Sequence, residues 1–506
     1  MQIRRSLRPL LPILGLSLAF GGCSLIPPYL LPKFDTSSDY HEAVAPVQAD
    51  LPWKVAATQA LPQAPWQIFD LPELPELLGR LESANASLAL SQARYNQAAA
   101  LIDQATAGLF PAVSGNAGVT RARNNGTTSN TATTNSISLS SNWEIDLWGR
   151  LRATVDANEA SAKASAADLA GVRLALQAQL VQSLLSLRIV EVQRNLLDAT
   201  VADYERYLQL TNDRIRFGVA SRADQAQAET QLRSAQAQAV ETGVQRAQLE
   251  HAIAVLVGEL PANFKLPAPP AGAPALRAQL RGSGDVAQPG SGTTHASIFD
   301  LVPALPTVPL SAPSTLLERR PDIAAAERRA AAANAQVGVA RAAFFPVLSL
   351  TGTAGQRSTA LSDLLTAPAR FWSIGPSLVA PLFDAGLRSS QKAQAVAVWE
   401  QSTASYRQTV LAAFQEVEDQ LSTLRILADE AKIQDAAVKA ARVSAELTQA
   451  QYRAGVASSL QVIVANSALL TAERSALDLH NRRLSAAVVL IRALGGGWPG
   501  TGEAAG

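Results

Sequence analysis

Cysteine and histidine are scarce in this sequence of 506 residues, which contains one cysteine and four histidines. A single cysteine has no partner within its own chain, so an intrachain disulfide is excluded. The histidines lie far apart, at positions 41, 251, 295 and 480. No Ser/His/Asp, His/Glu metal-binding or phosphate-loop spacing accompanies them. The sequence therefore predicts no catalytic site and no metal site, and we expect a protein that is not an enzyme.

An excess of either charge is also missing, because 43 Lys and Arg residues face 42 Asp and Glu residues. Without a basic patch to neutralise phosphates, a nucleic-acid partner is not expected. Long apolar runs are absent too: after residue 23 no run of about 18 apolar residues exists, which argues against a transmembrane helix. Yet 48% of the residues are hydrophobic and the mean hydropathy is +0.07. The sequence must therefore accommodate its many apolar residues in some structure other than a transmembrane helix.

The first 22 residues have the pattern of a secretory signal. Arg4, Arg5 and Arg8 form a positive region, and an apolar stretch from residue 10 to residue 20 follows it. This order of a basic and then an apolar segment is typical of a signal peptide that is removed on export. We therefore expect residues 1–22 to be absent from the mature protein.

The only cysteine, Cys23, stands directly after this signal. The run Ala-Phe-Gly-Gly-Cys at positions 19–23 resembles the lipobox of bacterial lipoproteins, whose cysteine thiol is acylated and becomes the first residue. Phe20 departs from the aliphatic residue usual there, and a chance cysteine after an ordinary signal is the alternative. Ser24 follows the cysteine, whereas lipoproteins kept in the inner membrane usually carry Asp at that position. We predict a lipid anchor on Cys23 and an outer-membrane location.

Prolines and glycines divide the chain into two copies of one unit. Proline is missing between Pro111 and Pro261 and again between Pro381 and Pro499. Because proline in a helix interior costs about 3 kcal/mol, long helices are possible in these two segments. Glycines mark both segments in one rhythm, 149, 218 and 258 in the first and 386, 455 and 495 in the second, each 237 residues later. The sequence is an internal repeat.

Within the proline-free segments the apolar spacing is helical. Residues 410, 414, 417, 421, 424 and 428 are apolar and alternate steps of four and three. A spacing near 3.5 predicts coiled-coil packing. A helix of more than sixty residues would be roughly 100 Å long. We therefore expect long coiled-coil helices in both copies.

Four strands are expected between these helices, at about 112–122, 136–147, 347–356 and 371–383. The clearest alternation is in the second, where Ile137, Leu139, Trp143, Ile145 and Leu147 alternate with polar residues. Such alternation is typical of a transmembrane strand, and equally of a half-buried strand in a soluble protein. Four strands cannot close a barrel, and an open sheet edge is not tolerated in lipid. If the strands span a membrane, several chains must share one barrel.

Five local motifs stand out along the two repeats. They are LLERRPDI at 316–323, AAFFP at 342–346, PLFDAG at 381–386, YRQTV at 406–410 and WEIDLWGR at 143–150. Together they resemble the TolC-like outer-membrane factors, in particular the lipidated branch that serves resistance-nodulation-division efflux pumps. The resemblance covers residues from about 66 to 494.

This resemblance implies a mainly α fold with a β-barrel portion, built from two tandem repeats. Three chains would form a 12-stranded outer-membrane barrel over a periplasmic α-barrel of long helices. The homotrimer would meet an inner-membrane efflux pump through a periplasmic adaptor protein. It would carry small molecules and drugs outward without a cofactor, the only added groups being the diacylglycerol and acyl (palmitate) lipid on Cys23. Two alternatives stay open: an exit duct for type I protein secretion, and a periplasmic adaptor.

The resemblance also implies a narrow periplasmic aperture where a long helix turns back, at residues 452–467. Tyr452 matches a family tyrosine that helps to tie the closed state, and Asp224 in the first repeat matches its acidic partner. Leu460 matches an aperture leucine of the efflux branch. The arginine often found at the position of Ala457 is absent.

Aperture carboxylates of the family are absent as well, since their positions are occupied by Gln461 and Val464. A ring of carboxylates would attract cations, whereas an apolar ring of Leu460 and Val464 would gate by close packing or dewetting. We therefore predict weak cation selectivity and little block by trivalent cations. The alternative is that Val464 belongs to an ordinary coiled-coil core.

The expected layout has six parts. Residues 1–22 are the signal, 23–65 a lipid-anchored tether, 66–266 the first repeat, 267–313 a Pro/Gly-rich connector, 314–499 the second repeat and 500–506 a tail. Within the connector, residues 281–295 have the composition of a low-complexity insertion.

Overall fold

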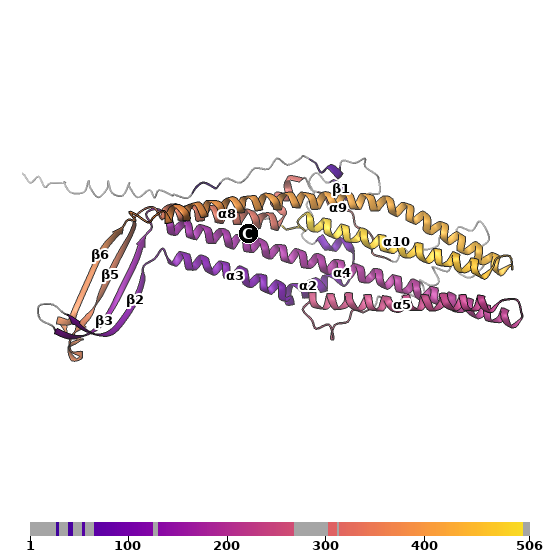
Figure 1. The fold of residues 1–506 in the computed structure, drawn as a ribbon, viewed down its shortest axis with the longest axis horizontal. Coiled ribbons are helices and arrows are strands. Elements are labelled where there is room, and N and C mark those ends of the chain that lie inside the picture. Colours follow the sequence, from indigo (N-terminus) through magenta and orange to yellow (C-terminus); the bar gives the residue numbers. More distant parts are fainter. Residues whose placement is uncertain are drawn as a thin grey trace, which may run out of the picture. The chain divides into compact units, whose positions relative to one another are not determined.

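The computed structural model describes residues 27–29, 39–43, 53–55, 65–124, 130–267, 302–310 and 313–498 (Figure 1). The predicted signal at 1–22, Cys23, most of the tether, the 281–295 insertion with most of its connector, and the 500–506 tail lie outside the described residues.

The chain divides into two compact units. The first comprises Met1–Phe34, Gln92–Asp168 and Asp322–Thr409, and the second comprises Asp35–Ser91, Leu169–Pro321 and Val410–Gly506. The helices α3 (Ala86–Ala107), α4 (Arg150–Arg216) and α9 (Leu387–Arg453) each contribute several residues to both units.

The predicted repeat is confirmed in the helices. α4 and α9 have 67 residues each, and the helices that follow them, α5 (Arg222–Leu256) and α10 (Ser459–Ala493), have 35 residues each. At the end of α4, Gly218 has a φ of 73°, and at the end of α9, Gly455 has a φ of 79°. Only glycine adopts this left-handed backbone without strain, so these residues end the long helices and turn the chain back.

Shorter helices precede the strands and the long helices. They are α2 (Leu74–Ala84), α7 (Leu316–Arg319) and α8 (Pro321–Ala342). Single 3₁₀ turns are η2 (His41–Ala43), η3 (Pro65–Phe69), η5 (Pro313–Thr315), η6 (Leu361–Asp363) and η7 (Ala367–Ala369).

The four predicted strands form one antiparallel sheet in the first unit (Figure 1). They are β2 (Ala112–Asn124), β3 (Asn130–Ile145), β5 (Val347–Ser358) and β6 (Arg370–Val379), in the order β2-β3-β5-β6. β3 begins earlier than predicted because Thr131–Thr134 pair with β2, and β6 ends earlier, two residues before Pro381. Large apolar side chains on the sheet are exposed in the single chain: Leu139, Trp372, Ile374 and Leu378.

A second, small sheet joins parts of the expected tether and connector. β1 (Trp53–Val55) pairs in parallel with β4 (Val308–Leu310). About ten residues before β1, the backbone N–H groups of His41 and Glu42 donate to the Glu418 carboxylate of α9 at 2.8 and 3.1 Å. These contacts were not predicted, because three-residue strands carry no periodicity that could indicate a partner more than 250 positions away.

The core of the second unit lies along the seams between its helices. Val417, Leu421 and Leu424 of α9 are fully buried, as their predicted coiled-coil spacing requires, and Val410 is buried as well. Val417, Leu421 and Leu424 belong to a core whose other members include Leu184 and Leu187 of α4 and Leu484 and Leu490 of α10.

No helix in the described parts of the chain combines the length and the hydrophobicity needed to cross a membrane.

Candidate functional site

The tips of the two long-helix hairpins, in the second unit, carry the residues that the sequence singled out. Each tip is closed by the same backbone geometry. The N–H of Val219 donates to Arg214 O after α4, and the N–H of Val456 donates to Gln451 O after α9, both at 2.9 Å. This bond pattern around a left-handed glycine is a Schellman motif, which satisfies carbonyls at the helix end.

A capping box starts each returning helix. At α5, the Ser221 hydroxyl accepts the Asp224 N–H at 3.2 Å, and the Asp224 carboxylate accepts the Ser221 N–H at 2.9 Å. At α10, the Ser458 hydroxyl and the Gln461 side chain form the same reciprocal pair. The box fixes where each helix begins. Asp224 and Gln461 are therefore local helix caps, whatever else they do.

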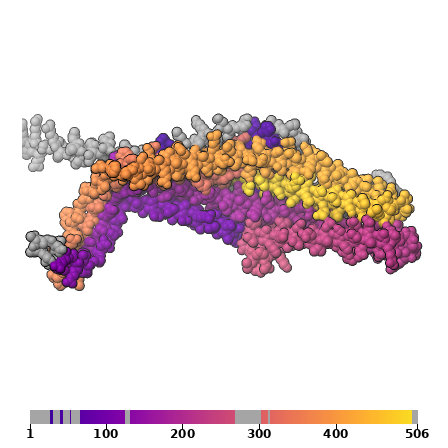
Figure 2. Space-filling view, in the orientation of Figure 1, coloured from indigo at the N-terminus to yellow at the C-terminus, as the bar shows by residue number. Residues whose placement is uncertain are grey.

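Side-chain contacts join the tips to one another. The ribbon and space-filling views show the end of α9 and the start of α10 beside the end of α4 and the start of α5 (Figures 1 and 2). Tyr452, which is only 3% exposed, lies under the Arg214 guanidinium at 4.0 Å from ring centroid to Cζ. Tyr207, which like Arg214 is on α4, has its ring centroid 5.5 Å from that of Tyr452. Separately, the Ser459 hydroxyl donates to the Asp224 carboxylate at 2.9 Å.

The structure thus brings Tyr452 and Asp224 to the same pair of tips, with different partners from those expected. Among the described residues, Asp224 hydrogen-bonds Ser459 across the tips and forms no bond with Tyr452, whose contacts are with Arg214 and Tyr207. Sequence reasoning missed Arg214, Tyr207 and Ser459. A usable signal existed for two of them, because Tyr207 and Arg214 are seven residues apart and so share one helix face.

The electrostatics of the tips favour a charged Asp224 and a neutral Tyr207. The Ser221 N–H, the Ser221 hydroxyl and the Ser459 hydroxyl all stabilise the carboxylate, and they hold the pKa of Asp224 below its usual value. Burial raises the pKa of Tyr207 to about 12. At physiological pH the contact between Arg214 and the Tyr452 ring therefore lies beside a neutral Tyr207 side chain.

The remaining aperture candidates lie on the first turns of α10. Leu460 and Val464 are large apolar residues four positions apart, and both are exposed, Val464 by 60%. They therefore share one exposed face of α10. Val464 is not buried in the core of its own chain, so the alternative that it is a core residue finds no support within one protomer.

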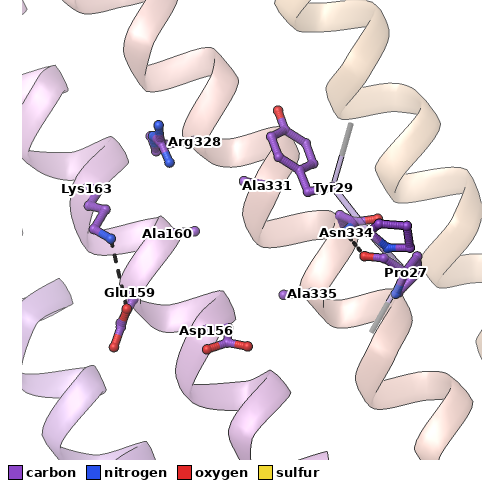
Figure 3. Close-up of a pocket in the computed structure, with 11 residues that line it drawn as sticks. Pro27, Tyr29, Asp156, Glu159, Ala160, Lys163, Arg328, Ala331, Asn334 and Ala335 are labelled. Carbon is purple, nitrogen blue, oxygen red and sulfur yellow. Dashed lines mark hydrogen bonds and ion pairs between the residues drawn. The ribbon is translucent and has the colours of Figure 1, made fainter. Parts of the chain in front are cut away.

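A separate pocket of about 400 Å³ lies in the first unit, between α4 and α8 (Figure 3). Pro27, Pro28 and Tyr29 form one wall of it, and Asp156, Glu159 and Lys163 line it from α4. The Asn334 side chain donates to Pro27 O at 2.9 Å. Cys23 is four positions before Pro27 and lies outside the described residues.

Within the described residues, no group of three or more His, Cys, Asp or Glu side chains is placed to hold a metal ion.

Comparison with known proteins gives consistent matches over most of the chain. The outer membrane efflux protein family matches residues 77–259 and 312–496. The pyoverdine export outer membrane protein OpmQ of Pseudomonas putida is 31% identical, over 87% of this chain and 89% of that protein. The toluene efflux pump outer membrane protein TtgI of Pseudomonas putida is 30% identical, over 96% of this chain and 98% of that protein.

A solved structure, that of the outer-membrane channel OprN, superposes with a TM-score of 0.81. It is 28% identical and covers 94% of this chain and 100% of that chain. The two matched segments of the efflux family coincide with the two copies seen in the helices and strands.

Proposed function

Since the chain belongs to the outer membrane efflux protein family, we propose that it is the trimeric exit duct of a tripartite efflux system. The chain is an outer-membrane efflux channel, and its family membership sets aside the periplasmic-adaptor alternative. The observation that carries the proposal is the match of both repeats to this family, together with a fold shared with OprN.

The open sheet of one chain supports assembly into a homotrimer. β2 and β6 are the edges of the four-stranded sheet, and among the described residues each has one side without a partner strand. Unpaired backbone groups in lipid cost several kcal/mol each, so the edges need partner strands. Three copies would supply a closed set of 12 strands, and the exposed Trp372, Ile374 and Leu378 would then face lipid.

We propose small organic molecules, including drugs, as the exported compounds. The relatives TtgI and OpmQ are named for toluene efflux and pyoverdine export, and these compounds share little chemistry. This chemical difference between the exported compounds supports an exit duct that accepts any compound that the pump delivers. The partners are accordingly an inner-membrane efflux pump and a periplasmic adaptor. No observation favours the alternative of type I protein secretion.

The contacts between the tips support a gate. We propose that Arg214 on Tyr452 and Ser459 on Asp224 hold the two hairpins together in the closed state. Leu460 and Val464, exposed on α10, would form the apolar constriction once three chains surround one axis. Gln461 contributes by capping α10, since its side chain is bonded to Ser458.

The function is tested by deleting the gene and restoring it in trans. Deletion should raise susceptibility to small apolar antibiotics and solvents, and the restored chain should reverse this. The outer-membrane fraction should contain a trimer that dissociates on heating. Unchanged susceptibility together with loss of a secreted protein would instead establish the secretion duct.

We further propose that Cys23 carries the diacylglycerol and acyl lipid. Radiolabelled palmitate should be incorporated into the wild-type chain and not into Cys23→Ala. A mature wild-type mass without the added lipid would contradict the anchor.

A further inference from the structure

The four-stranded sheet of the first unit has one face that carries its large exposed apolar side chains. Val119 of β2, Leu139 of β3 and Trp372 of β6 are 69%, 61% and 77% exposed. Leu139 pairs with Ala354 of β5, which pairs with Trp372, so Leu139 and Trp372 lie on the same side of the sheet. Val119 lies there too, because it is four residues from Gly115, the partner of Leu139 on β2. In the proposed trimer this apolar face contacts lipid.

Two arginines continue the apolar face at the ends of the strands that lie away from the helices. Arg121 is two residues beyond Val119 on β2, and Arg370 is two residues before Trp372 on β6. Because side chains alternate along a strand, both arginines lie on the apolar face, and so does Arg123. Arg121 and Arg370 are exposed, and within the described residues neither has an ion pair or a side-chain hydrogen bond.

The two arginines are at the same distance from the helix-side ends of their strands. Arg121 is nine residues after Ala112, the first residue of β2, and Arg370 is nine residues before Val379, the last residue of β6. Nine residues of strand are about 30 Å long, and a tilt of about 40° in a barrel leaves about 23 Å across the membrane. Outer-membrane barrels have an apolar band about 25 Å tall. Both arginines therefore lie at the outer border of this band, where the lipid headgroups begin.

In a single chain the two arginines are on opposite edges of the sheet. β3 and β5 separate β2 from β6, so Arg121 and Arg370 are three strand spacings, or at least about 14 Å, apart. One phosphate group cannot contact both. In the proposed trimer, β6 of one chain meets β2 of the next, and four strands per chain keep this pairing antiparallel. The junction then brings Arg370 of one chain and Arg121 of the next to neighbouring strands, at the same level of the membrane.

No carboxylate of the sheet neutralises these two positive charges. β2, β5 and β6 contain no Asp or Glu, and Glu144 of β3 lies at the helix-side end, where Arg150 donates to it at 2.8 Å. Asp363, in the connection between β5 and β6, accepts the Ser362 hydroxyl at 3.0 Å. Like charges on neighbouring strands repel each other, so the junction favours an anion from outside the protein.

We infer that each junction between chains binds a phosphate group of a phosphorylated glycolipid in the outer leaflet. Arg370 of one chain and Arg121 of the next hold the phosphate, since a guanidinium binds phosphate oxygens in pairs. The acyl chains of the same lipid lie along the apolar face, over Trp372 and Val119. The inference rests on the proposed trimer, because one chain alone supplies only half of each site.

The test measures binding of bis-phosphorylated lipid A to the purified trimer in detergent by native mass spectrometry. The wild type should bind three molecules, one at each junction. Arg121→Gln and Arg370→Gln should each weaken binding at least about ten-fold, because either change removes one of the two guanidinium groups that hold the phosphate. The conservative double variant Arg121→Lys/Arg370→Lys keeps the charge and should bind more tightly than either glutamine variant.

Arg357→Gln is the matched control, because it removes the same charge from the outer end of β5. Arg357 pairs with Ser136, one position from Ile137 on β3, so it lies on the face opposite to Arg121 and Arg370. Its guanidinium is 4.7 Å from the ring centroid of Phe371. The variant should bind lipid A as the wild type does. An equal loss in this control, or unchanged binding by Arg121→Gln or Arg370→Gln, would overturn the site.

Three further probes separate the possible occupants. Dephosphorylated lipid A, phosphatidylglycerol and inorganic phosphate should each bind at least about ten-fold more weakly than the bis-phosphorylated probe. Equal binding of any of them would assign the junction to acyl chains alone, to a phospholipid or to a free anion, and would overturn the glycolipid site. The same spectra report assembly: a monomer would refute the trimer and the site together, whereas an intact trimer without bound lipid A would refute the site alone.

Discussion

At the level of single residues, the proposed gate depends most on the contact between Arg214 and Tyr452. It joins the end of α4 to the end of α9, and both the guanidinium over the ring and the bond from Arg214 Nη2 to Tyr452 O contribute. Tyr207 packs on the same ring, so three side chains from two repeats meet at one point. Asp224 and Ser459 add a second, independent bond.

Replacing Arg214 by Ala should favour the open gate. A partly buried cation–π contact contributes about 1 kcal/mol, or roughly a five-fold change in the opening equilibrium of each chain. We expect higher single-channel conductance in planar bilayers and greater entry of large antibiotics that the outer membrane excludes. Arg216→Ala is the matched control, because Arg216 is exposed and, within the part of the chain that the structure describes, pairs with the nearby Asp213 alone. Equal behaviour of the two variants would remove Arg214 from the gate.

His480 on α10 should make the stability of the second unit depend on pH. Burial and the nearby Arg483 lower the pKa of His480 below 6.5, against the opposing effect of its contact with Pro303 O at 2.8 Å. A group whose pKa is lower in the folded state stabilises the fold above its unfolded pKa and loses that contribution as the pH falls below about 6.5.

The apparent Tm of the wild-type chain should therefore fall between about pH 7.5 and pH 5.5 by more than that of His480→Gln, as followed by circular dichroism. His251→Gln provides the control, because His251 is exposed on α5 and should leave the pH dependence of the wild type in place. Parallel Tm curves for the wild type and His480→Gln would show that His480 does not contribute.

At the level of elements, the two 35-residue helices end in the same way. After α5, a Cβ on Gly258 would lie 2.3 Å from Ala84 O, and after α10, a Cβ on Gly495 would lie 2.2 Å from Arg319 O. Both glycines have a positive φ, 76° and 92°. Each repeat thus packs the end of its returning helix against the backbone at the end of a short helix, α2 in the first copy and α7 in the second.

Gly258→Ala and Gly495→Ala should each destabilise the second unit by about 2–4 kcal/mol, from the left-handed backbone and the backbone clash together. Gly79→Ala is the control, because Gly79 is exposed in α2 with open space around it and Ala is the better helix former. Chemical denaturation of the purified protein measures the difference. A destabilisation below about 0.5 kcal/mol for either variant would contradict the close packing.

The elements also show where sequence reasoning worked and where it did not. The missing prolines and the repeated glycines predicted α4, α5, α9 and α10, because proline and left-handed glycine act locally on the backbone. The alternation around Leu139 and Trp143 predicted β3 for the same reason. The pairing of β1 with β4 was not predictable, since it depends on buried Trp53 and Val308 meeting across the folded chain.

At the level of the whole molecule, the proposed trimer concentrates small features of one chain on a common axis. Each chain contributes one exposed Val464, and three copies would form an apolar ring. We expect the wild-type channel to be weakly cation-selective in planar bilayers, with little block by trivalent cations, because the ring has no carboxylates to focus charge.

Val464→Asp should create a ring of three carboxylates and with it cation selectivity and strong block by trivalent cations. Ser234→Asp adds the same charge on an exposed position of α5 and serves as the control. Strong block of the wild-type channel, or equal block of both variants, would show that Val464 does not line the constriction.

The sequence by itself determined the parts of this protein that depend on local chemistry. These are the long helices, the glycine turns at Gly218 and Gly455, the four strands, the repeat, and the region that contains Tyr452 and Asp224. The tertiary structure decided which residues meet: Arg214 with Tyr452, Ser459 with Asp224, and Asn334 with Pro27. Periodicity determines which face of a helix a side chain occupies. The residue that packs against that face belongs to a distant segment, which only the folded chain brings near.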